Sequence, residues 1–600
     1  MSSKELKTRE QTDKKYKWNI EAMMPDESVI DKDLEQLKKE ALEYGQKYCG
    51  HLASSSSALL EALQEKDSIW RKLEKIYVYA RMRRDEDNAL DKYQGMSDKC
   101  HSVIAAVSAA MAFFTPELLS APEDRILGFL AENSQLKEYQ FAIKDTLRQK
   151  EHILTEAEEN LLAQIGEITS STNDIFTMLN NADIKFGKIK DEDGDCVQVT
   201  HGNYIRFMES SNRQVRKAAY DAMYDSYKAL INTIATTYNY NTKTDVITAR
   251  IRKYPSARSA ALSGDNIPAE VYDNLVSVVN GNLPSLHRYT DLRKKLLGVD
   301  KLYMYDMYVP LIDSPQKSVS YEEGLDMMRE ALLPLGAEYI DKMNEGISQG
   351  WIDVYENKGK TSGAYSFGSY DSYPYILLNY TDTLKDVFTI IHEMGHSMHS
   401  RYTRSNQPYI YGSHSIFTAE VASTVNESLL MEHLLKNAND VEMKKYLLNL
   451  HLEEFRTTLF RQTMFAEFED ITHKAIENGQ VLTSDWMCGQ YEDLNHKYYG
   501  SAVERDDIIK YEWARIPHFY NAFYVYKYAT GYSAATAISN KILTDSDTAA
   551  HDYIKFLKTG ESAYPIELLQ IAGVDMSTQL PIEKAMDTFN SLLDEFESLV

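Results

Sequence analysis

The sequence predicts a mainly α-helical fold with a small β-sheet embedded in it. Apolar residues recur at helical spacing through most of the chain, for example at Leu59, Leu63 and Leu73. Short runs of alternating apolar residues next to turn residues mark two β-like regions, 182–202 and 350–380. There is no tandem repeat and no low-complexity linker, so we expect helices with an α+β core rather than a repeat array.

The first β-like region marks the predicted domain boundary. Two short alternating runs flank an Asp/Gly cluster in 182–202, which is typical of a hairpin. We predict an N-terminal helical domain over 1–190 and a main domain over 191–600. Within the main domain the small sheet covers about 350–380, and two helices that carry the site cover about 383–437.

Composition excludes several classes of partner. The 600 residues contain 65 Lys+Arg and 90 Asp+Glu, a net charge of −25, so we expect no nucleic-acid partner and no anionic membrane partner. The charged N-terminus lacks the apolar core of a signal peptide. The most apolar run, 103–114, is shorter than the roughly 18 residues that span a bilayer, and predicts a buried core helix. Four scattered cysteines without a CxxC pair indicate free thiols, and we expect a soluble, cytoplasmic protein.

The stretch 387-VFTIIHEMGHSMHSRY-402 carries a metal-binding pattern. His392 and His396 are four residues apart, which places both imidazoles on one face of a helix, one turn apart. Glu393 follows directly. Zinc makes water acidic enough to lose a proton near neutral pH, and a carboxylate at this position can accept that proton as the water attacks a carbonyl.

The same stretch has the frame of a helix. Thr383 and Asp386 fit a capping box at its start. A separate apolar stripe with spacings of three and four residues predicts the buried face, at Val387, Ile391, Met394 and Met398. The alternative is a surface helix with an incidental HExxH match.

A third metal ligand is predicted in the next helical stretch, 416–437. Glu420 lies among small residues that leave room for an ion, so with the two histidines it would hold one zinc ion per chain. Glu427, seven residues later on the same face, could orient an imidazole from outside the ligand shell. His399 shares the histidine face, but we expect a packing role for it. Two solvated helix glutamates are the alternative.

A tyrosine-rich stretch, 515-RIPHFYNAFYVYKYATGY-532, is the second candidate. Tyr520, Tyr524 and Tyr528 repeat every four residues and would line one face of a helix. A phenol, or the imidazole of His518, can donate a hydrogen bond to the oxyanion that forms when water adds to a peptide carbonyl. The alternative is an aromatic packing stripe.

Together these motifs resemble the oligoendopeptidase F group of the M3 family of zinc metallopeptidases. The resemblance rests on HEMGHSMH, FTAEVAST–NESLL and RIPHFY…FYVYKYATGY, and it extends to 182–204, 215–224, 350–368 and 564–576. It implies a neurolysin-like zincin fold, a helical clam-shell with a small β-sheet beside the active-site helix. It also implies a deep channel that admits short unstructured peptides, and a bacterial cytosolic setting.

The resemblance also implies residue roles. His392, His396 and Glu420 would be the zinc ligands and Glu393 the general base, while His518 and the tyrosines after it would be the transition-state donors. The segment 374–380 would be an edge strand along which a peptide is bound, and the glycines of 361–368 would allow a mobile loop over the cleft.

The predicted function is a zinc-dependent endopeptidase that hydrolyses internal bonds of short unstructured oligopeptides. One alternative is a zinc carboxypeptidase on a similar scaffold, with a cation such as Arg515 holding the terminal carboxylate. Another is a peptide-binding protein without catalysis, although a binder has no need for Glu393. The sequence makes no prediction of the oligomeric state.

Overall fold

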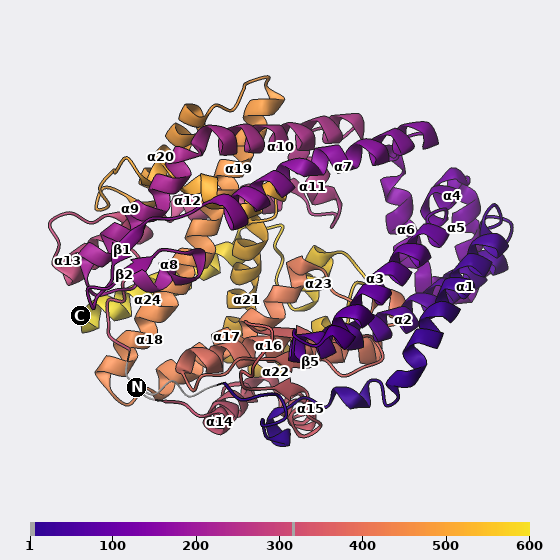
Figure 1. The fold of residues 1–600 in the computed structure, drawn as a ribbon, viewed down its shortest axis with the longest axis horizontal. Coiled ribbons are helices and arrows are strands. Elements are labelled where there is room, and N and C mark those ends of the chain that lie inside the picture. Colours follow the sequence, from indigo (N-terminus) through magenta and orange to yellow (C-terminus); the bar gives the residue numbers. More distant parts are fainter. Residues whose placement is uncertain (1–5, 315–317) are drawn as a thin grey trace. The chain divides into compact units, whose positions relative to one another are not determined.

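The computed structural model describes residues 6–314 and 318–600, and it confirms a mainly helical fold with small sheets (Figure 1). The chain forms two compact units, each assembled from three separate segments. Unit 1 comprises Met1–Lys150, Lys317–His433 and Ile538–Gly573, and unit 2 comprises Glu151–Gln316, Leu434–Ala537 and Val574–Val600. These units group segments by their contacts and do not divide the chain into consecutive domains. The predicted domain boundary near residue 190 therefore stays a prediction.

Unit 1 contains the helices of its first segment, those around the HEMGH motif in its second segment and those of its third segment. They are α1 (Ile30–Tyr48), α2 (Ser56–Glu86), α3 (Asp91–Met111), α4 (Phe114–Ser120), α5 (Glu123–Glu132), α6 (Gln140–Arg148), α14 (Tyr321–Ala331), α15 (Ala337–Ser348), α16 (Leu384–Asn406), α17 (Ile416–Asn437), α22 (Ser546–Leu557) and α23 (Pro565–Ile571). The last residues of α17 already belong to unit 2.

The apolar run at 103–114 is only partly buried, contrary to the prediction of a core helix. Cys100, Val103 and Val107 on α3 are buried, and α3 packs against α1 and α2. The opposite face exposes alanines, whose small apolar side chains raise the hydropathy without needing a partner, and serines. Asp91–Ser120 is one stretch of the described chain with the length and apolar composition to cross a membrane, and 33% of its apolar window is buried.

A three-stranded sheet in unit 1 corrects two predictions. Its order is β3 (Ile352–Asp353), β5 (Tyr375–Leu377), β4 (Tyr365–Phe367), with β3 parallel and β4 antiparallel to β5. β5 is therefore the central strand and fully buried, so the predicted edge strand at 374–380 is wrong. β4, within the predicted mobile loop at 361–368, is the edge strand instead, because only one of its sides is paired.

An N-terminal strap, residues 7–19, runs beside strand β3 of this sheet. The carbonyl of Tyr16 accepts a hydrogen bond from the N–H of Val354 (2.9 Å), and the N–H of Asn19 donates to Gly350 (2.7 Å). Charged side chains are buried where the strap meets β3: Asp353 is 1% exposed and pairs with Arg9 (2.5 Å) and Lys360 (2.7 Å). The strap therefore fixes the outer strand β3 through both backbone and ionic interactions.

Unit 2 is almost entirely helical and carries the predicted hairpin. β1 (Lys188–Lys190) and β2 (Cys196–Gln198) pair antiparallel, which confirms the hairpin in 182–202. The helices are α7 (Glu156–Met178), α8 (His201–Met208), α9 (Arg213–Ala229), α10 (Ile231–Ile251), α11 (Ala257–Ser263), α12 (Ala269–Gly281), α13 (Leu283–Leu297), α18 (Val441–Glu454), α19 (Arg461–Glu477), α20 (Ser484–Tyr499) and α24 (Leu580–Leu599). The remaining helix, α21 (Tyr526–Thr544), passes into unit 1.

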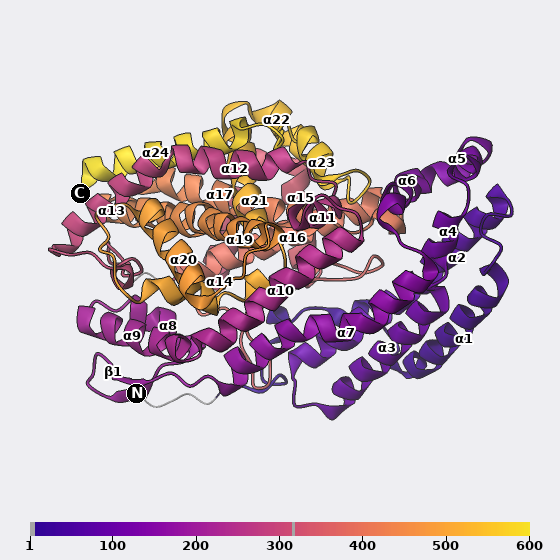
Figure 2. The same cartoon turned by 90° about the horizontal axis from the view of Figure 1, so that it is seen from above.

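The C-terminal helix completes the core of unit 2. α24 packs against α12 and α18, and Figure 2 shows it beside α12. Its inner face is apolar at helical spacing, with Ile582, Phe589, Leu593 and Phe596 buried. All four cysteines of the chain are free, as predicted.

The buried ion pair under the strap can be tested with Lys360→Met. The side chain of Lys360 is fully buried against Asp353, so its replacement leaves a buried carboxylate with one partner fewer. We expect the free energy of unfolding to fall by about 3 kcal/mol in urea denaturation. Lys15→Met is the control, because Lys15 pairs with Glu322 in full solvent and its loss should leave the midpoint unchanged. Equal midpoints for the two variants would contradict this account.

Candidate metal centre and catalytic residues

Helix α16 is built as the sequence predicted. Thr383 and Asp386 form a capping box at its N-terminus, with both reciprocal hydrogen bonds present. The apolar stripe is fully buried, at Val387, Ile391, Met394 and Met398. With this face in the core, His392 and His396 on the other face approach Glu420 of α17.

His392, His396 and Glu420 come together at one point. One possible ligand atom from each lies within 4.8 Å of the other two. The Nε2 atoms of His392 and His396 are each 3.7 Å from the same carboxylate oxygen of Glu420. Two imidazole nitrogens and one carboxylate oxygen are the donor set of catalytic zinc sites, so these residues fit a zinc ion with a further coordination position open.

Gly395 allows the two helices to approach closely enough for this. A Cβ atom on Gly395 would lie 2.6 Å from Cα of Ser423 and 2.7 Å from the carbonyl oxygen of Ala422. Both atoms belong to the backbone of α17 and cannot rotate away. A second tie nearby is the Asn426 side chain, which donates to the carbonyl of Ile391 (3.2 Å). The absence of a side chain at Gly395 therefore lets α17 come close enough for Glu420 to approach the two histidines.

Each histidine of the centre has an outer partner. A carboxylate oxygen of Glu427 lies 3.3 Å from Nδ1 of His392, as predicted, and His396 hydrogen-bonds to the backbone of Ala419. These contacts orient the rings so that Nε2 points toward Glu420. Burial disfavours a charge on His392, but Glu427 and the nearby glutamates outweigh it and raise the pKa to about 9. Burial and the charge of His392 lower the pKa of His396 to about 3.

Glu393 lies beside the metal ligands in a protected position. Its side chain is 8% exposed, and burial raises the pKa of its carboxyl group to about 7. The backbone N–H of Ser366 on β4 donates a hydrogen bond to this carboxylate and favours its ionised form. A second link joins the strand to the helix, because the hydroxyl groups of Ser366 and Ser397 are 2.8 Å apart. The sequence carried no signal for Ser366, since its part depends on strand placement.

His399 has the packing role that was expected. Its ring is 1% exposed and stacks on His414 at 4.2 Å, with Phe556 on a further side. His414 is not a plain surface residue, because this stacking covers much of its ring. Both histidines lie outside the group of atoms that converge on Glu420.

The tyrosine-rich stretch lies in unit 2 and is not one continuous helix. Residues Pro517–Tyr520 form a short 3₁₀ turn, Phe523 has a left-handed backbone (φ 53°), and α21 begins only at Tyr526. The predicted stripe of three tyrosines on one helical face is therefore wrong. Pro517 starts the turn, and the reversal at Phe523 separates it from α21.

Three of the four predicted donors nevertheless cluster. The hydroxyl of Tyr528 is 3.3 Å from Nε2 of His518, and the ring of Tyr524 stacks parallel to His518 at 5.9 Å. Tyr520 makes a different contact, with its ring stacked on Phe176 at 4.4 Å and its hydroxyl buried. Catalytic roles for all four stay predictions.

Glu469 of α19 supports this cluster, and sequence reasoning missed it. Its fully buried carboxylate accepts a hydrogen bond from the N–H of Phe523 (2.7 Å), at the backbone reversal. Burial raises the pKa of Glu469 to about 8. A glutamate within an amphipathic helix gives no sequence signal for such a role.

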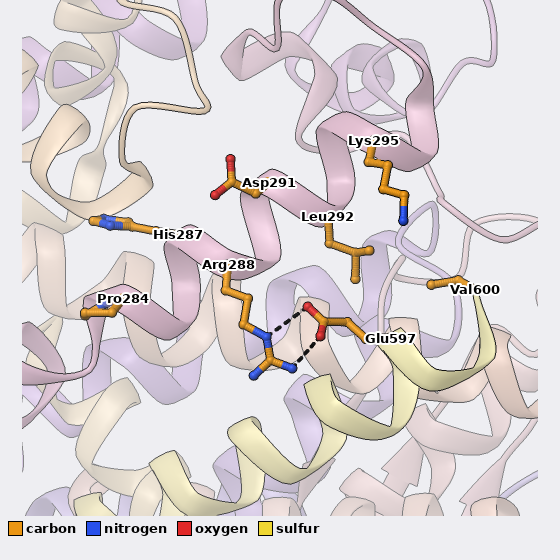
Figure 3. Close-up of a pocket in the computed structure, with 8 residues that line it drawn as sticks. All are labelled: Pro284, His287, Arg288, Asp291, Leu292, Lys295, Glu597 and Val600. Atoms are coloured by element: carbon orange, nitrogen blue, oxygen red, sulfur yellow. Dashed lines mark hydrogen bonds and ion pairs between the residues drawn. The ribbon is translucent and has the colours of Figure 1, made fainter.

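A separate pocket lies between α13 and α24 of unit 2 (Figure 3). Its volume is about 610 Å³, and Arg288 in its wall is held by both carboxylate oxygens of Glu597 at 2.9 and 2.6 Å. This pocket holds none of the predicted site residues.

The geometry defines a class of protein before any comparison is made. Two histidines one turn apart, an intervening glutamate and a carboxylate from the next helix are the arrangement of zincin metallopeptidases. Comparison with known proteins agrees. The family model for peptidase family M3 matches residues 206–588, and the model for oligopeptidase F matches residues 117–186.

Several relatives match almost the whole chain. Oligopeptidase PepF of Bacillus subtilis is 49% identical over 97% of this chain and 87% of its own length, and an oligoendopeptidase F homolog of Lactococcus lactis is 43% identical over 99% of both. The crystal structure of oligoendopeptidase-F from Enterococcus faecium is 39% identical with a TM-score of 0.75, covering 95% of this chain and 99% of that one. A crystallised protein of Chlamydophila abortus reaches a TM-score of 0.93 at 36% identity, covering 99% and 100%.

This chain belongs to peptidase family M3. It is an oligoendopeptidase of that family, a metalloendopeptidase, which confirms the predicted class of enzyme. This assignment replaces the two alternatives, a carboxypeptidase and a binding protein without catalysis.

Gly395→Ala tests the helix contact. The added methyl group would push α17 away from α16 and move the Glu420 carboxylate, so we expect affinity for a divalent metal to fall about 10–100-fold in a chelator competition assay. Gly489→Ala on α20 is the matched control, because its Cβ would meet open space. The account fails if Gly395→Ala binds metal as tightly as the control.

Glu469→Gln tests the buried carboxyl group. The folded state holds its proton up to about pH 8, whereas the unfolded chain releases it near 4.5, so the stability gained from the proton is lost as pH rises between these values. The amide cannot ionise. We therefore expect the difference in Tm, variant minus wild type, to grow across this range and to level off above it. A difference independent of pH would contradict the proposed burial effect.

Proposed function

We propose that this metalloendopeptidase holds one zinc ion per chain with His392, His396 and Glu420 and cleaves internal bonds of short oligopeptides. The observation that carries the proposal is the convergence of the three donor atoms within 4.8 Å, with Glu393 buried next to them. Zinc, when bound, would act as a Lewis acid and make water more acidic. Oligopeptide substrates are supported by the names of the relatives, such as oligopeptidase PepF.

Glu393 is the proposed general base. Burial raises the pKa of its carboxyl group, and the carboxylate can accept a proton from the attacking water and then pass it to the leaving amine. The N–H of Ser366 keeps the carboxylate in place and favours its ionised state. The edge strand therefore positions the base.

The edge strand β4 is the proposed support for the substrate backbone. One side of β4 is paired with β5, and among the described residues no strand pairs with its other side, where an extended peptide would add next to the Ser366 N–H that binds Glu393. Peptide bound in this way would lie beside Ser366 and therefore beside Glu393. Recognition through main-chain hydrogen bonds favours unstructured segments, because folded chains have no free backbone to offer.

His518, Tyr524 and Tyr528 are the proposed donors to the oxyanion. Their clustered imidazole and phenol groups have the required chemistry. Burial and, to a smaller extent, the charge of Arg461 lower the pKa of His518, which favours its neutral imidazole form. A cytoplasmic setting is also proposed, on the basis of the free thiols and the acidic composition.

Digestion of a peptide library of mixed lengths, with every cleavage site mapped, tests the function. Cuts at internal bonds that vanish with a chelator and return with zinc support the proposal. Peptides blocked at the C-terminus should be cleaved as readily as free ones. Cleavage that persists in chelator, or that only trims C-terminal residues, would refute it.

Glu393→Gln separates catalysis from metal binding. The amide keeps the size of the side chain but cannot accept the proton, so we expect kcat to fall by about 10²–10⁴-fold while one zinc per chain remains. Metal content is read by elemental analysis alongside turnover. Glu420→Ala is the contrasting variant and should lose zinc and turnover together. Wild-type turnover by Glu393→Gln would remove Glu393 from the role of base.

A further inference from the structure

Unit 2 holds four arginines, two of them buried and two half-buried, around two carboxylates, a group that we name the arginine cluster. Its members are Arg293, Arg456, Arg461, Arg515, Glu453 and Glu512. Glu453 binds both Arg456 (2.6 Å) and Arg293 (3.3 Å), and Glu512 binds Arg461 (2.6 Å). The fourth cation, Arg515, contacts the hydroxyl of Tyr224 (3.3 Å) and shares the field of Glu512.

No further carboxylate from the described ranges balances these charges. Asp306 lies beside Arg293, which donates to its carbonyl oxygen (3.0 Å), but the carboxylate of Asp306 pairs with Arg213 and Arg216 at 2.8 Å each. The cluster therefore carries two positive charges more than negative ones. Burial of unbalanced charge is costly, so a counter-ion is expected unless the charges reach water. Side-chain exposure is 1% for Arg456 and 16% for Arg461.

Three donors of this region have no acceptor in the part of the chain that the structure describes. They are Nη1 of Arg456, Nε of Arg461 and the hydroxyl of Tyr499. Arg456 and Tyr499 are each 1% exposed. Buried donors are almost always paired, and an unpaired set indicates a bound water or ion.

The backbone places Arg456 and Arg461 on the same side of one continuous helical segment. Residues Phe455–Phe460 form a π-helix that runs into α19 at Arg461. In a π-helix the hydrogen bonds join residues five apart, so Arg456 and Arg461 lie about one turn apart. The charges of both arginines act on Tyr499, and the ring of Tyr308 lies 5.3 Å from the guanidinium of Arg456. The three orphaned donors thus belong to one charged region of unit 2.

We propose that Arg456, Arg461 and Tyr499 bind a small monovalent anion of halide size. Water alone would accept the hydrogen bonds but would leave the excess positive charge unbalanced. A halide ion accepts from all three donors and also lowers the net charge of the arginine cluster. The site lies wholly within unit 2 and does not depend on the metal centre.

Tyr499→Phe is the cleanest variant for the test. It removes one hydroxyl that has no protein partner and leaves the ring in place, so the fold should be retained. Tyr44→Phe is the matched control, because it removes another buried hydroxyl without an acceptor, on α1 of unit 1. Arg461→Gln serves as a second variant, since it removes one charge of the cluster.

The measurement is the Tm of each protein as chloride rises at constant ionic strength, with methanesulfonate as the replaced anion. Chloride that binds only the folded protein should raise the Tm of the wild type and of Tyr44→Phe alike. Tyr499→Phe and Arg461→Gln should need about tenfold more chloride for the same rise. Crystals grown with bromide should show an anomalous peak within hydrogen-bonding distance of the three donors.

Two results would overturn the proposal. One is a Tm that does not respond to chloride, even if bromide appears at the high concentration of the crystal. The other is an equal response of Tyr499→Phe, Arg461→Gln and Tyr44→Phe, which would place the halide effect elsewhere on the protein.

Discussion

The backbone contact between α16 and α17 at Gly395 is the constraint on which the metal centre depends. Because the added atom of any other side chain would meet Ala422 and Ser423, only glycine permits this separation. Two hydrogen bonds stabilise this contact. The side chain of Asn426 on α17 donates to the carbonyl of Ile391 on α16, and the hydroxyl of Tyr553 on α22 donates to the carbonyl of Ala422 (3.4 Å). Helix packing, and not the ligands themselves, sets the distance across the centre.

Burial has opposite uses in the two units. In unit 1 it leaves Glu393 with one backbone donor and a pKa near neutrality, which suits a group that must both accept and release a proton. In unit 2 Glu453 and Glu512 are surrounded by guanidinium groups, which hold their pKa values below the usual range despite burial. A single carboxylate in a sparse environment is reactive, whereas one in a dense network is structural.

Sequence reasoning succeeded where the signal is local. The capping box at Thr383, the buried stripe of α16 and the shared face of His392 and His396 all follow from spacing along one helix. It failed where partners are distant in sequence, since nothing in 374–380 shows that β5 is paired on both sides. The helical stripe through the tyrosines failed for another reason: backbone geometry at Phe523 overrides a spacing of four, and no residue type there announces it.

The interleaved segments of the two units affect how the protein can be made. Unit 1 requires Ile538–Gly573, so the first 150 residues emerge from the ribosome long before their last partner segment has been translated. Unit 2 likewise waits for its final segment, Val574–Val600, which contributes α24. Each unit is complete only when its third segment has been made. The apolar faces of helices made early must wait for partners made late, and such exposed faces are a route to misfolding in large chains.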